Sequence, residues 1–335
     1  MTWLWRRSRP VAVLISAIGA AVVATVALAA TAGTGGASSP GASSPDGAAS
    51  GPATAPAAGA APIPVVAAEN QYASVIAQVG GRFVSVSALL SNPSTDPHTF
   101  EASPVVAREV GAARLVVQNG LGYDSFMDGI ERAEPSAGRQ VLTVASLLRL
   151  PASTPNPHLW YSPAAMPAVA AAVAAGLARI DPAHGAYFRA SAATFTASLG
   201  PWHSALAALR AGRDGTPVAT TEPVADYLLQ AAGMDNKTPW AFQADIMNGV
   251  DPSPQAVATV RDLLATRAVR ALVYNVQVTD PLTTSLVTLA HAHGIPVVGV
   301  YETMPQPGYQ YQSWMLAEAG ALARAITTRQ STERL

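Results

Sequence analysis

The chain has 335 residues, half of them hydrophobic, with 20 basic residues against 21 acidic ones and no cysteine. This length exceeds that of one average domain, so two domains are expected. A net charge of −1 provides no basic field for a phosphate backbone, which argues against nucleic-acid binding. The lack of cysteine excludes disulfides, thiolate metal sites and cysteine nucleophiles.

The N-terminus has the pattern of an export segment. Three arginines among the first nine residues precede an uncharged run over residues 11–32. A charged start, an apolar core and small residues at the end are typical of a secretory signal. Ala-x-Ala cleavage sites occur at 27–29 and 30–32, but the run is also long enough to span a bilayer. Residues 1–32 are therefore a signal peptide or an uncleaved anchor, and membrane association is expected only through them.

Residues 33–62 are predicted to form a flexible linker. They consist only of Gly, Ala, Ser, Pro and Thr, apart from Asp46, which is the only charged residue. Such a segment cannot bury enough apolar surface to become ordered. Without the export segment the chain keeps 17 basic residues against 21 acidic ones, so the exported part is mildly acidic.

Residues 63–182 are predicted to form an N-terminal metal-binding lobe in which strands and helices alternate. Strands are predicted at 63–68, 83–86, 115–117 and 141–144. Ser103 followed by Pro104 is a typical helix start. Alternating strands and helices indicate a parallel sheet that is covered on both faces.

Residues 213–335 repeat this plan as a C-terminal metal-binding lobe. Strands are predicted there at 217–220, 269–274 and 296–300. Between the lobes, the chain is almost entirely helix-forming apart from a break near Asp181 and Pro182, and residues 183–212 are predicted to form a connecting helix. The expected fold is therefore α/β, with two doubly wound lobes of mainly parallel sheets joined by one long connecting helix.

Four polar residues stand where ligands of such sheets usually bind, beyond the carboxyl ends of strands. His98 follows the second predicted strand, and His158 precedes a helix. Glu222 and Glu302 directly follow strands in the second lobe. Two imidazoles and two carboxylates, one pair from each lobe, make a suitable site for a divalent cation.

Each of these residues also has an ordinary interpretation. A histidine beside a proline turn is commonly solvated, and a glutamate after a strand is commonly favoured by the dipole of the next helix. The remaining histidines are expected at the surface or at helix ends: His184, His203, His291 and His293. Four acids near loops are expected to be solvated or capping residues: Glu69, Asp245, Asp251 and Asp280.

Two segments resemble known metal-ligand motifs. Residues 95–101, Thr-Asp-Pro-His-Thr-Phe-Glu, and 156–163, Asn-Pro-His-Leu-Trp-Tyr-Ser-Pro, are similar to the two histidine motifs of bacterial solute-binding protein family 9. These proteins are the metal-binding subunits of ABC transporters for manganese, zinc or iron. The resemblance covers about residues 63–329 and implies that His98 and His158 coordinate the metal.

The same resemblance places Glu222 and Glu302 at the positions of the third and fourth ligands. It implies one divalent metal ion, manganese, zinc or iron, held between the lobes as the transported ligand. An ABC permease and its ATPase are the implied partners. The protein is then expected to be a monomer, exported to the periplasm or the outer face of the cytoplasmic membrane, and not an enzyme.

The chain departs from this family pattern in three places. A His-rich acidic loop before the second motif is missing, and Glu302 stands where aspartate is common. Asn275, with Gln277 nearby, replaces a common acidic residue, and whether either joins the metal shell is open. The ligand set is half oxygen, which suits manganese, although zinc ranks above manganese in intrinsic affinity for almost any ligand set.

Two other functions remain open at this point. A secreted metallohydrolase would need an open metal position and a nearby base, for which Glu101 is the candidate. An adhesin or scaffold could use the metal as a structural staple. Neither H-E-x-x-H nor G-x-S-x-G occurs in the sequence.

Overall fold

The computed structural model describes residues 61–92, 100, 103–305 and 307–335. The predicted export segment, nearly all of the predicted linker, His98 and Glu101 lie outside these residues. Within the described ranges, no helix combines the length and the apolar character needed to cross a membrane.

The N-terminal lobe is built on a sheet of four parallel strands. These are β1 (Ile63–Glu69), β2 (Val84–Leu90), β3 (Leu115–Gln118) and β4 (Gln140–Thr143). Their order is β2-β1-β3-β4, and every neighbouring pair is parallel. The four predicted strands are confirmed. β3 is buried along its whole length, as expected for a central parallel strand covered on both faces.

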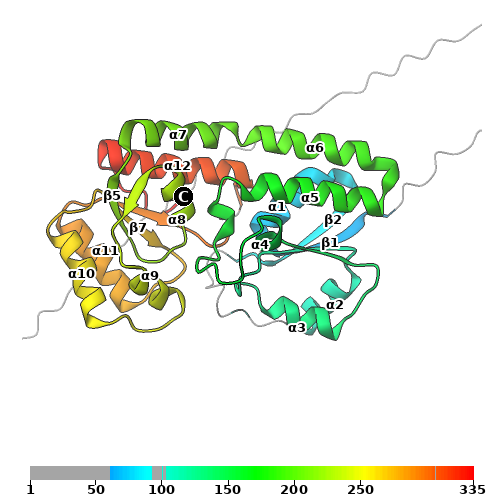
Figure 1. The fold of residues 1–335 in the computed structure, drawn as a ribbon, viewed down its shortest axis with the longest axis horizontal. Coiled ribbons are helices and arrows are strands. Elements are labelled where there is room, and N and C mark those ends of the chain that lie inside the picture. The colour runs from blue at the N-terminus through cyan, green and yellow to red at the C-terminus, as the bar shows by residue number, and fades with distance from the viewer. Residues whose placement is uncertain (1–60, 93–99, 101–102, 306) are drawn as a thin grey trace, which may run out of the picture. The chain divides into compact units, whose positions relative to one another are not determined.

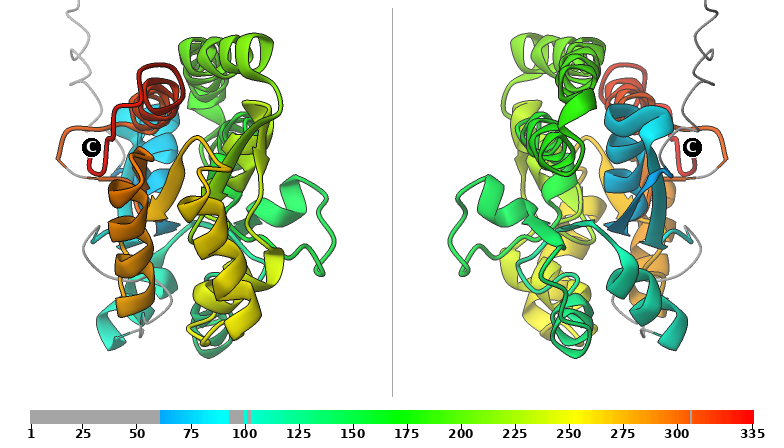
Figure 2. Two further views of the ribbon diagram at one scale, coloured as in Figure 1. Left: turned by 90° about the vertical axis from the view of Figure 1, so that its left-hand side faces the viewer. Right: turned by 90° about the vertical axis from the view of Figure 1, so that its right-hand side faces the viewer.

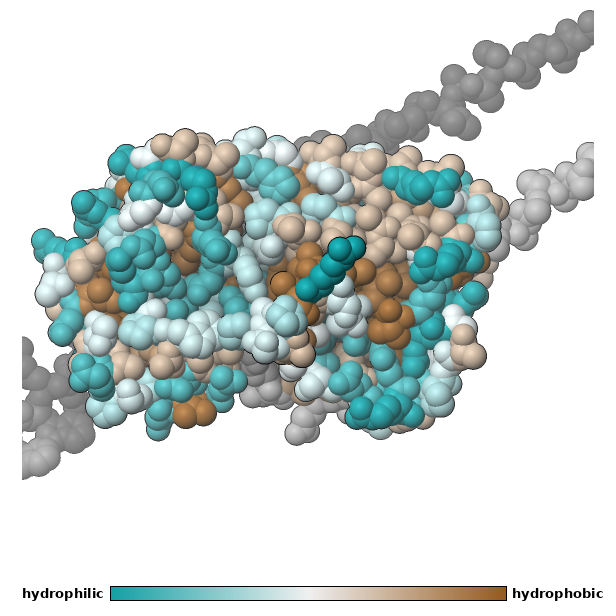
Figure 3. Space-filling model, viewed as in Figure 1, coloured by the Kyte–Doolittle hydropathy of each residue, from teal (hydrophilic) through white to brown (hydrophobic). Residues whose placement is uncertain are grey.

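Helices cover both faces of this sheet. They are α1 (Asn70–Gly80), α2 (Pro104–Ala112), α3 (Phe126–Ala133), α4 (Val144–Leu147) and α5 (Ala165–Ile180). The predicted start of α2 is confirmed, because the backbone N–H of Val106 donates to Ser103 Oγ at 3.4 Å. In Figure 3, apolar residues gather on the side of the view where α5 and α6 lie, in keeping with their alanine-rich sequences.

The connection between the lobes consists of two consecutive helices, α6 (Gly185–Ser198) and α7 (Gly200–Arg213). A 3-10 turn at Pro182–His184 precedes α6, where the sequence predicts a break. Leu199 separates the two helices, and Pro201 follows in the first turn of α7. Because proline has no N–H to donate, it favours a new helix start at this point. The predicted connecting helix is thus present in two segments, which run end to end beside both sheets (Figure 1).

The C-terminal lobe also contains four parallel strands. These are β5 (Thr216–Thr220), β6 (Met234–Asn236), β7 (Leu272–Asn275) and β8 (Val297–Val300). Their order is β6-β5-β7-β8. Three of them are predicted, whereas β6 is not, because its sequence of Met, Asp and Asn has no apolar alternation. The order places β7 between β5 and β8, which matters for the site described below.

Five helices complete this lobe: α8 (Asp226–Ala231), α9 (Trp240–Met247), α10 (Pro254–Ala265), α11 (Pro281–Ala292) and α12 (Tyr311–Thr328). The expectation that Asp280 caps a helix is confirmed, because the N–H of Thr283 donates to its Oδ1 at 2.7 Å. Figures 1 and 2 show α12 on the same side of the sheets as α6 and α7.

A single large apolar core crosses from one lobe to the other. Trp160 from the first lobe and Trp314 from α12 are both fully buried within it. Tyr311 OH donates to the backbone oxygen of Trp160 at 2.6 Å, so the packing is also joined by hydrogen bonds. The two halves of the molecule therefore share one interior, and the ends of their strands meet beside it.

Candidate metal centre

The C-terminal lobe contributes two carboxylates at equivalent positions. Glu222 lies two residues beyond the end of β5, and Glu302 lies two residues beyond the end of β8. Both are buried, with exposed fractions of 3% and 0%. Because parallel strands end at the same edge of a sheet, this common offset brings both side chains to the edge that faces the other lobe.

The amide of Asn275, the last residue of β7, joins these two carboxylates. Its Nδ2 donates to Glu302 Oε1 at 2.7 Å and to Glu222 Oε1 at 3.2 Å. Asn275 is 1% exposed, so these bonds form away from bulk water. The neutral amide thereby separates two buried carboxylates that would otherwise repel each other.

Gln277 fixes the segment that carries Glu302. Its Oε1 accepts hydrogen bonds from the backbone N–H of Glu302 at 2.7 Å and of Thr303 at 2.9 Å. Its Nε2 donates to Thr303 Oγ1 at 2.9 Å. The sequence leaves open whether Gln277 belongs to the metal shell. The structure gives it contacts to the backbone that positions Glu302.

Side chains of the N-terminal lobe hold the same segment from the other side. Asn70 Nδ2 donates to the oxygen of Met304 and Asn70 Oδ1 accepts from its N–H, both at 2.9 Å. Tyr161 OH likewise pairs with both the oxygen and the N–H of Tyr301, at 3.0 and 3.2 Å. The backbone on both sides of Glu302 is thus bonded to the opposite lobe.

His158 is the predicted ligand that the described part of the N-terminal lobe contributes. Asn156 determines which ring nitrogen carries the proton in the neutral form of His158. Asn156 Nδ2 donates to the oxygen of Pro223 at 2.8 Å, which directs its Oδ1 toward His158. That Oδ1 lies 2.8 Å from His158 Nδ1 and also accepts from the His158 backbone N–H. An oxygen acceptor at this place requires a proton on Nδ1, so in the neutral imidazole the lone pair that can bind a metal ion is on Nε2.

The two lobes meet where His158 faces Glu302. His158 Nε2 lies 3.5 Å from Glu302 Oε2, and neither side chain is exposed. Tyr123 OH donates to the same Oε2 atom at 2.9 Å. Burial, together with the charge of Glu302, raises the pKa of Tyr123 well above its ordinary value, so the phenol remains a donor. Tyr123 was not predicted from the sequence, although it lies only five residues beyond the end of the buried strand β3.

The loop that carries Tyr123 has an unusual backbone. Gly120, Leu121 and Gly122 have φ values of 83°, 57° and 83°, three left-handed residues in succession. Asp124 stabilises this loop by accepting hydrogen bonds from the N–H groups of Asn119 and Gly120. A Cβ atom at position 120 would lie 2.7 Å from the Cγ2 atom of Thr143, so this position requires glycine for space as well as for φ.

Glu69 differs from its sequence prediction. It occupies the N-cap position of α1, but its side chain makes no capping bond and is completely buried. Burial, followed by the nearby Asp124 carboxylate, raises the pKa of Glu69 well above its ordinary value. The expectation of a solvated or capping acid is therefore wrong, because the helix start lies inside the lobe. Glu69 is instead a buried acid of the interior, where burial favours the protonated form of its side chain.

The structure brings His158, Glu222 and Glu302 into one connected cluster around Asn275, and His98 lies outside the described residues. Within the described ranges, no three His, Cys, Asp or Glu side chains form a group that could hold a metal ion. The ligand roles of the four residues stay a prediction. His184 and His291 lie away from the cluster at partly exposed positions, paired with Asp181 and Glu333 respectively.

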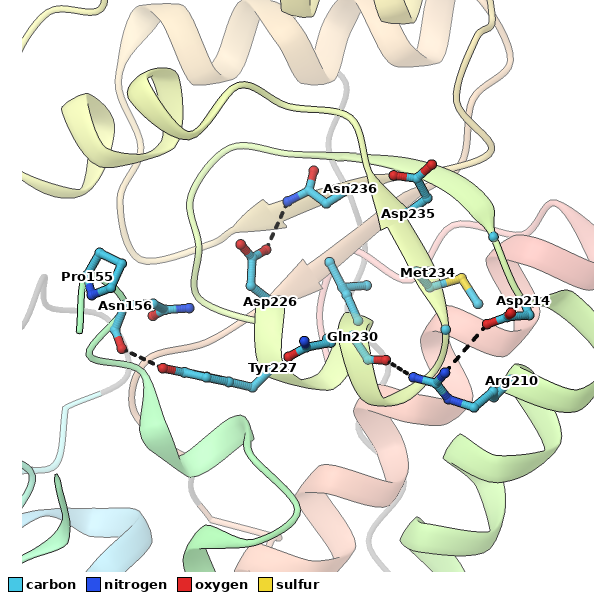
Figure 4. A pocket seen from close by; sticks show the side chains of 13 residues that line it. Pro155, Asn156, Arg210, Asp214, Asp226, Tyr227, Gln230, Met234, Asp235 and Asn236 are labelled. Carbon is cyan, nitrogen blue, oxygen red and sulfur yellow. Dashed lines mark hydrogen bonds and ion pairs between the residues drawn. The ribbon is translucent and has the colours of Figure 1, made fainter. Parts of the chain in front are cut away.

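Two pockets lie close to the cluster. One, of about 660 Å³, is bordered by α7, α8 and β6 and includes Asn156 and Tyr227, whose OH donates to the Asn156 oxygen at 2.9 Å (Figure 4). The predicted ligands that the structure describes, His158, Glu222 and Glu302, do not line this pocket. The other, of about 420 Å³, lies between Tyr123 and α9 and has Trp240 at its edge. Tyr123 therefore stands between this second pocket and Glu302.

Comparisons with known proteins identify the family. The sequence profile of the family described as zinc-uptake complex component A, periplasmic, matches residues 65–325. The chain belongs to this family. Its members are periplasmic metal-binding solute-binding proteins that work with an ABC permease and an ATPase, rather than enzymes.

Solved structures show the same two-lobed fold. FpvC of Pseudomonas aeruginosa, solved with Mn²⁺, has a TM-score of 0.66 at 20% identity, over 80% of this chain and 99% of that one. The periplasmic zinc-binding protein TroA of Treponema pallidum has a TM-score of 0.67 at 16% identity, over 81% of this chain and 100% of that one. The expected α/β architecture with two parallel sheets is thus confirmed.

A shorter match comes from a Thermotoga maritima protein that has the provisional name of metal-binding protein. It is 29% identical over 99 residues, which is 30% of this chain. The match spans about a third of that relative, 34% of its length.

Proposed function

We propose that this protein captures one divalent transition-metal ion between its lobes and delivers it to an ABC permease and its ATPase. The proposed ligands are His98, His158, Glu222 and Glu302, and the proposed cargo is manganese, zinc or iron. The exported protein would act as a monomer, in the periplasm or on the outer face of the cytoplasmic membrane.

The observation that carries this proposal is the contact between His158 and Glu302. Nε2 and Oε2 of these residues come from opposite lobes and lie 3.5 Å apart in a fully buried position. Buried ionisable groups in proteins are either paired with each other or bound to metal ions. The Asn156 contact selects the tautomer of the neutral imidazole in which Nε2 carries the lone pair, which is the form that binds a metal.

The location of the cluster also supports capture and release. Ligands from both lobes would have to come together to bind an ion, so a change in the contacts between lobes would weaken the site. Docking on a permease is the proposed cause of that change. FpvC, whose structures contain Mn²⁺ or Ni²⁺, and the zinc-binding TroA share the fold, which supports a divalent metal as cargo.

Elemental analysis tests this proposal most directly. The protein, purified without a histidine tag, is exposed to a mixture of divalent metals and analysed for bound metal. We expect one equivalent per chain, and calorimetry should show one tight site. Two tight sites, or none, would contradict the proposed centre.

Variants connect the bound metal to the cluster. His158→Gln and Glu302→Gln should each weaken binding at least tenfold, since each removes one proposed donor. His291→Gln is the matched control, because His291 is half exposed and paired with Glu333 away from the cluster. Co-purification with a permease and an ATPase would separate metal delivery from an adhesin, and hydrolysis by the metal-loaded protein would favour a metallohydrolase.

A further inference from the structure

The side chain of Asn275 reaches both proposed carboxylate ligands of the C-terminal lobe. This residue ends β7, which lies between β5 and β8, the strands that lead into Glu222 and Glu302. Its Nδ2 contacts Oε1 of both residues, at 3.2 Å and 2.7 Å. The strand order therefore explains why one amide can serve two carboxylates.

The orientation of this amide is fixed by its other contacts. Asn275 Oδ1 accepts from the backbone N–H of Gln277 at 3.0 Å, and a backbone donor cannot change its role. The backbone N–H of Asn275 donates to Thr221 Oγ1 at 3.1 Å, which holds the residue in place. The NH₂ group must therefore face the carboxylates, and the amide oxygen is directed away from them. Asn275 is thus a hydrogen-bond donor to the proposed ligands and is not itself positioned as a ligand.

This arrangement affects how many oxygens each carboxylate can offer to a metal ion. A carboxylate chelates an ion when both of its oxygens turn toward it, which raises the coordination number. The Oε1 atoms of Glu222 and Glu302 accept from the Asn275 amide, and turning either one toward the ion would break its hydrogen bond. Glu302 Oε2, which accepts from Tyr123 OH, is the oxygen that already faces His158 Nε2. While the Asn275 bonds persist, Glu222 and Glu302 each have one oxygen committed to the amide.

We propose that Asn275 is a specificity-determining residue that limits Glu222 and Glu302 to one metal-bound oxygen each. This inference rests on the proposed function. Carboxylates that bind through single oxygens keep the coordination number low, as in the four-coordinate sites that zinc favours. Manganese suits oxygen-rich, six-coordinate sites and would lose the additional carboxylate oxygens. The hydrogen bonds of Asn275 thus oppose the preference for manganese that the ligand types alone suggest.

Competition titration of the full chain with Zn²⁺ and Mn²⁺ tests this assignment. Asn275→Ala removes the donor, so the manganese-to-zinc affinity ratio should rise about tenfold, the lower end of the effect of removing groups that orient metal ligands. Asn275→Asp removes the same donor but keeps the side chain's shape and an acceptor for the Gln277 N–H. It should raise the ratio as well. Asn275→Leu, which is similar in size and has neither a donor nor an oxygen, decides the test if the alanine variant does not fold.

The matched control is Asn236→Ala. Asn236 ends β6 of the same sheet, and its Nδ2 donates to the carboxylate of Asp226 at 2.9 Å. The control therefore removes an equivalent strand-end amide from a carboxylate that is not a proposed ligand. Its manganese-to-zinc ratio should stay within about twofold of wild type.

The outcomes separate this inference from the proposed function. An unchanged ratio in Asn275→Ala, with one metal still bound, would overturn the role of Asn275 and leave the metal site standing. A rise confined to Asn275→Asp would also overturn it, because the new carboxylate would then be acting as a ligand. Failure of wild type to bind either metal would overturn the proposed function. X-ray absorption of the zinc-loaded protein should show four donors, and six donors would contradict the inference.

Discussion

The two halves of the candidate centre are built differently. In the C-terminal lobe, Glu222 and Glu302 follow β5 and β8, the two strands on either side of β7, and are braced through Asn275 and Gln277. In the N-terminal lobe, His158 and Tyr123 come from irregular segments, and a hydrogen bond from the ring to Asn156 orients the imidazole. One half is positioned by strand order and the other by individual loop contacts.

This difference suggests a division of labour. A sheet edge with several cross-linked side chains resists distortion, so the carboxylate half is already arranged before a metal arrives. Loop segments have fewer contacts that fix them and are more easily displaced. We therefore expect the histidine half to be the part that responds to pH and to substitution.

The largest expected effect is the pH dependence of metal affinity. Both proposed histidines must be neutral to bind metal, and an ordinary imidazole has a pKa near 6.5. Lowering the pH from 7 to 5 should weaken affinity by roughly several hundredfold if both histidines are ligands. His158→Gln should show a shallower slope, because one competing proton is lost. Calorimetry across this range measures both, and a flat profile would mean that the histidine half does not bind metal.

Removal of the metal should affect stability but not secondary structure. Each lobe has its own sheet, so the ion joins surfaces that are already folded. At a free metal concentration 100 times Kd, the bound state gains about 2.7 kcal/mol, which a chelator removes. The melting temperature should therefore fall while far-UV circular dichroism stays nearly unchanged. Loss of helix signal on chelation would indicate a structural metal instead.

Support residues allow the two halves to be compared directly. Asn156→Ala should weaken metal binding about 10- to 100-fold, because the imidazole loses the acceptor that fixes its proton and orientation. Gln277→Ala should also lower the stability of the metal-free protein, because it leaves the buried N–H groups of Glu302 and Thr303 without their acceptor. Calorimetry and chemical denaturation of both variants provide the comparison. Equal stability losses would argue against the division described above.

The smallest expected effect, at most about 1.4 kcal/mol between pH 6 and 7, concerns Glu318, which lies where the two lobes join. Its Oε1 accepts from Trp314 Nε1 at 2.9 Å and from Tyr161 OH at 3.2 Å. Burial raises its pKa to about 8, so the folded protein holds a proton that the unfolded chain releases above its ordinary pKa. Stability should therefore fall as pH rises from about 4.5 to 8, by at most about 1.4 kcal/mol per pH unit.

Glu318→Gln keeps an acceptor for both donors but has no proton to lose. The metal-free variant should lose less stability than wild type between pH 6 and 7, as measured by urea denaturation. Glu69, whose pKa is also raised by burial, remains in both proteins, so some slope should persist. Identical slopes in the two proteins would show that Glu318 does not hold a proton in this range.

The sequence was informative where local pattern determines structure. Apolar runs predicted seven of the eight described strands, and the rule about strand ends predicted that Glu222 and Glu302 would share one sheet edge. β6 was missed because a three-residue edge strand with two polar residues has no periodicity. Its place in the sheet comes from its pairing with β5.

Contacts between distant parts of the chain were beyond prediction. Glu69 has the sequence setting of an ordinary helix-start acid, and only the packing of the lobe shows that it is buried. Tyr123 approaches Glu302 across 179 positions of sequence, and Asn275 reaches two carboxylates because of the strand order. A local motif could indicate that these residues were available, but not which atoms they would meet.

The attachment of residues 301–304 to the opposite lobe has a mechanical consequence. Asn70 and Tyr161 each form hydrogen bonds with both the backbone N–H and the C=O of one residue of this segment, much as a neighbouring strand would. Glu302 lies between these two sets of hydrogen bonds. Its segment is part of the C-terminal lobe in sequence but is hydrogen-bonded to the N-terminal lobe as well. Relative motion of the lobes would place tension on this stretch, so force applied at a distant docking surface would be transmitted directly to the carboxylate.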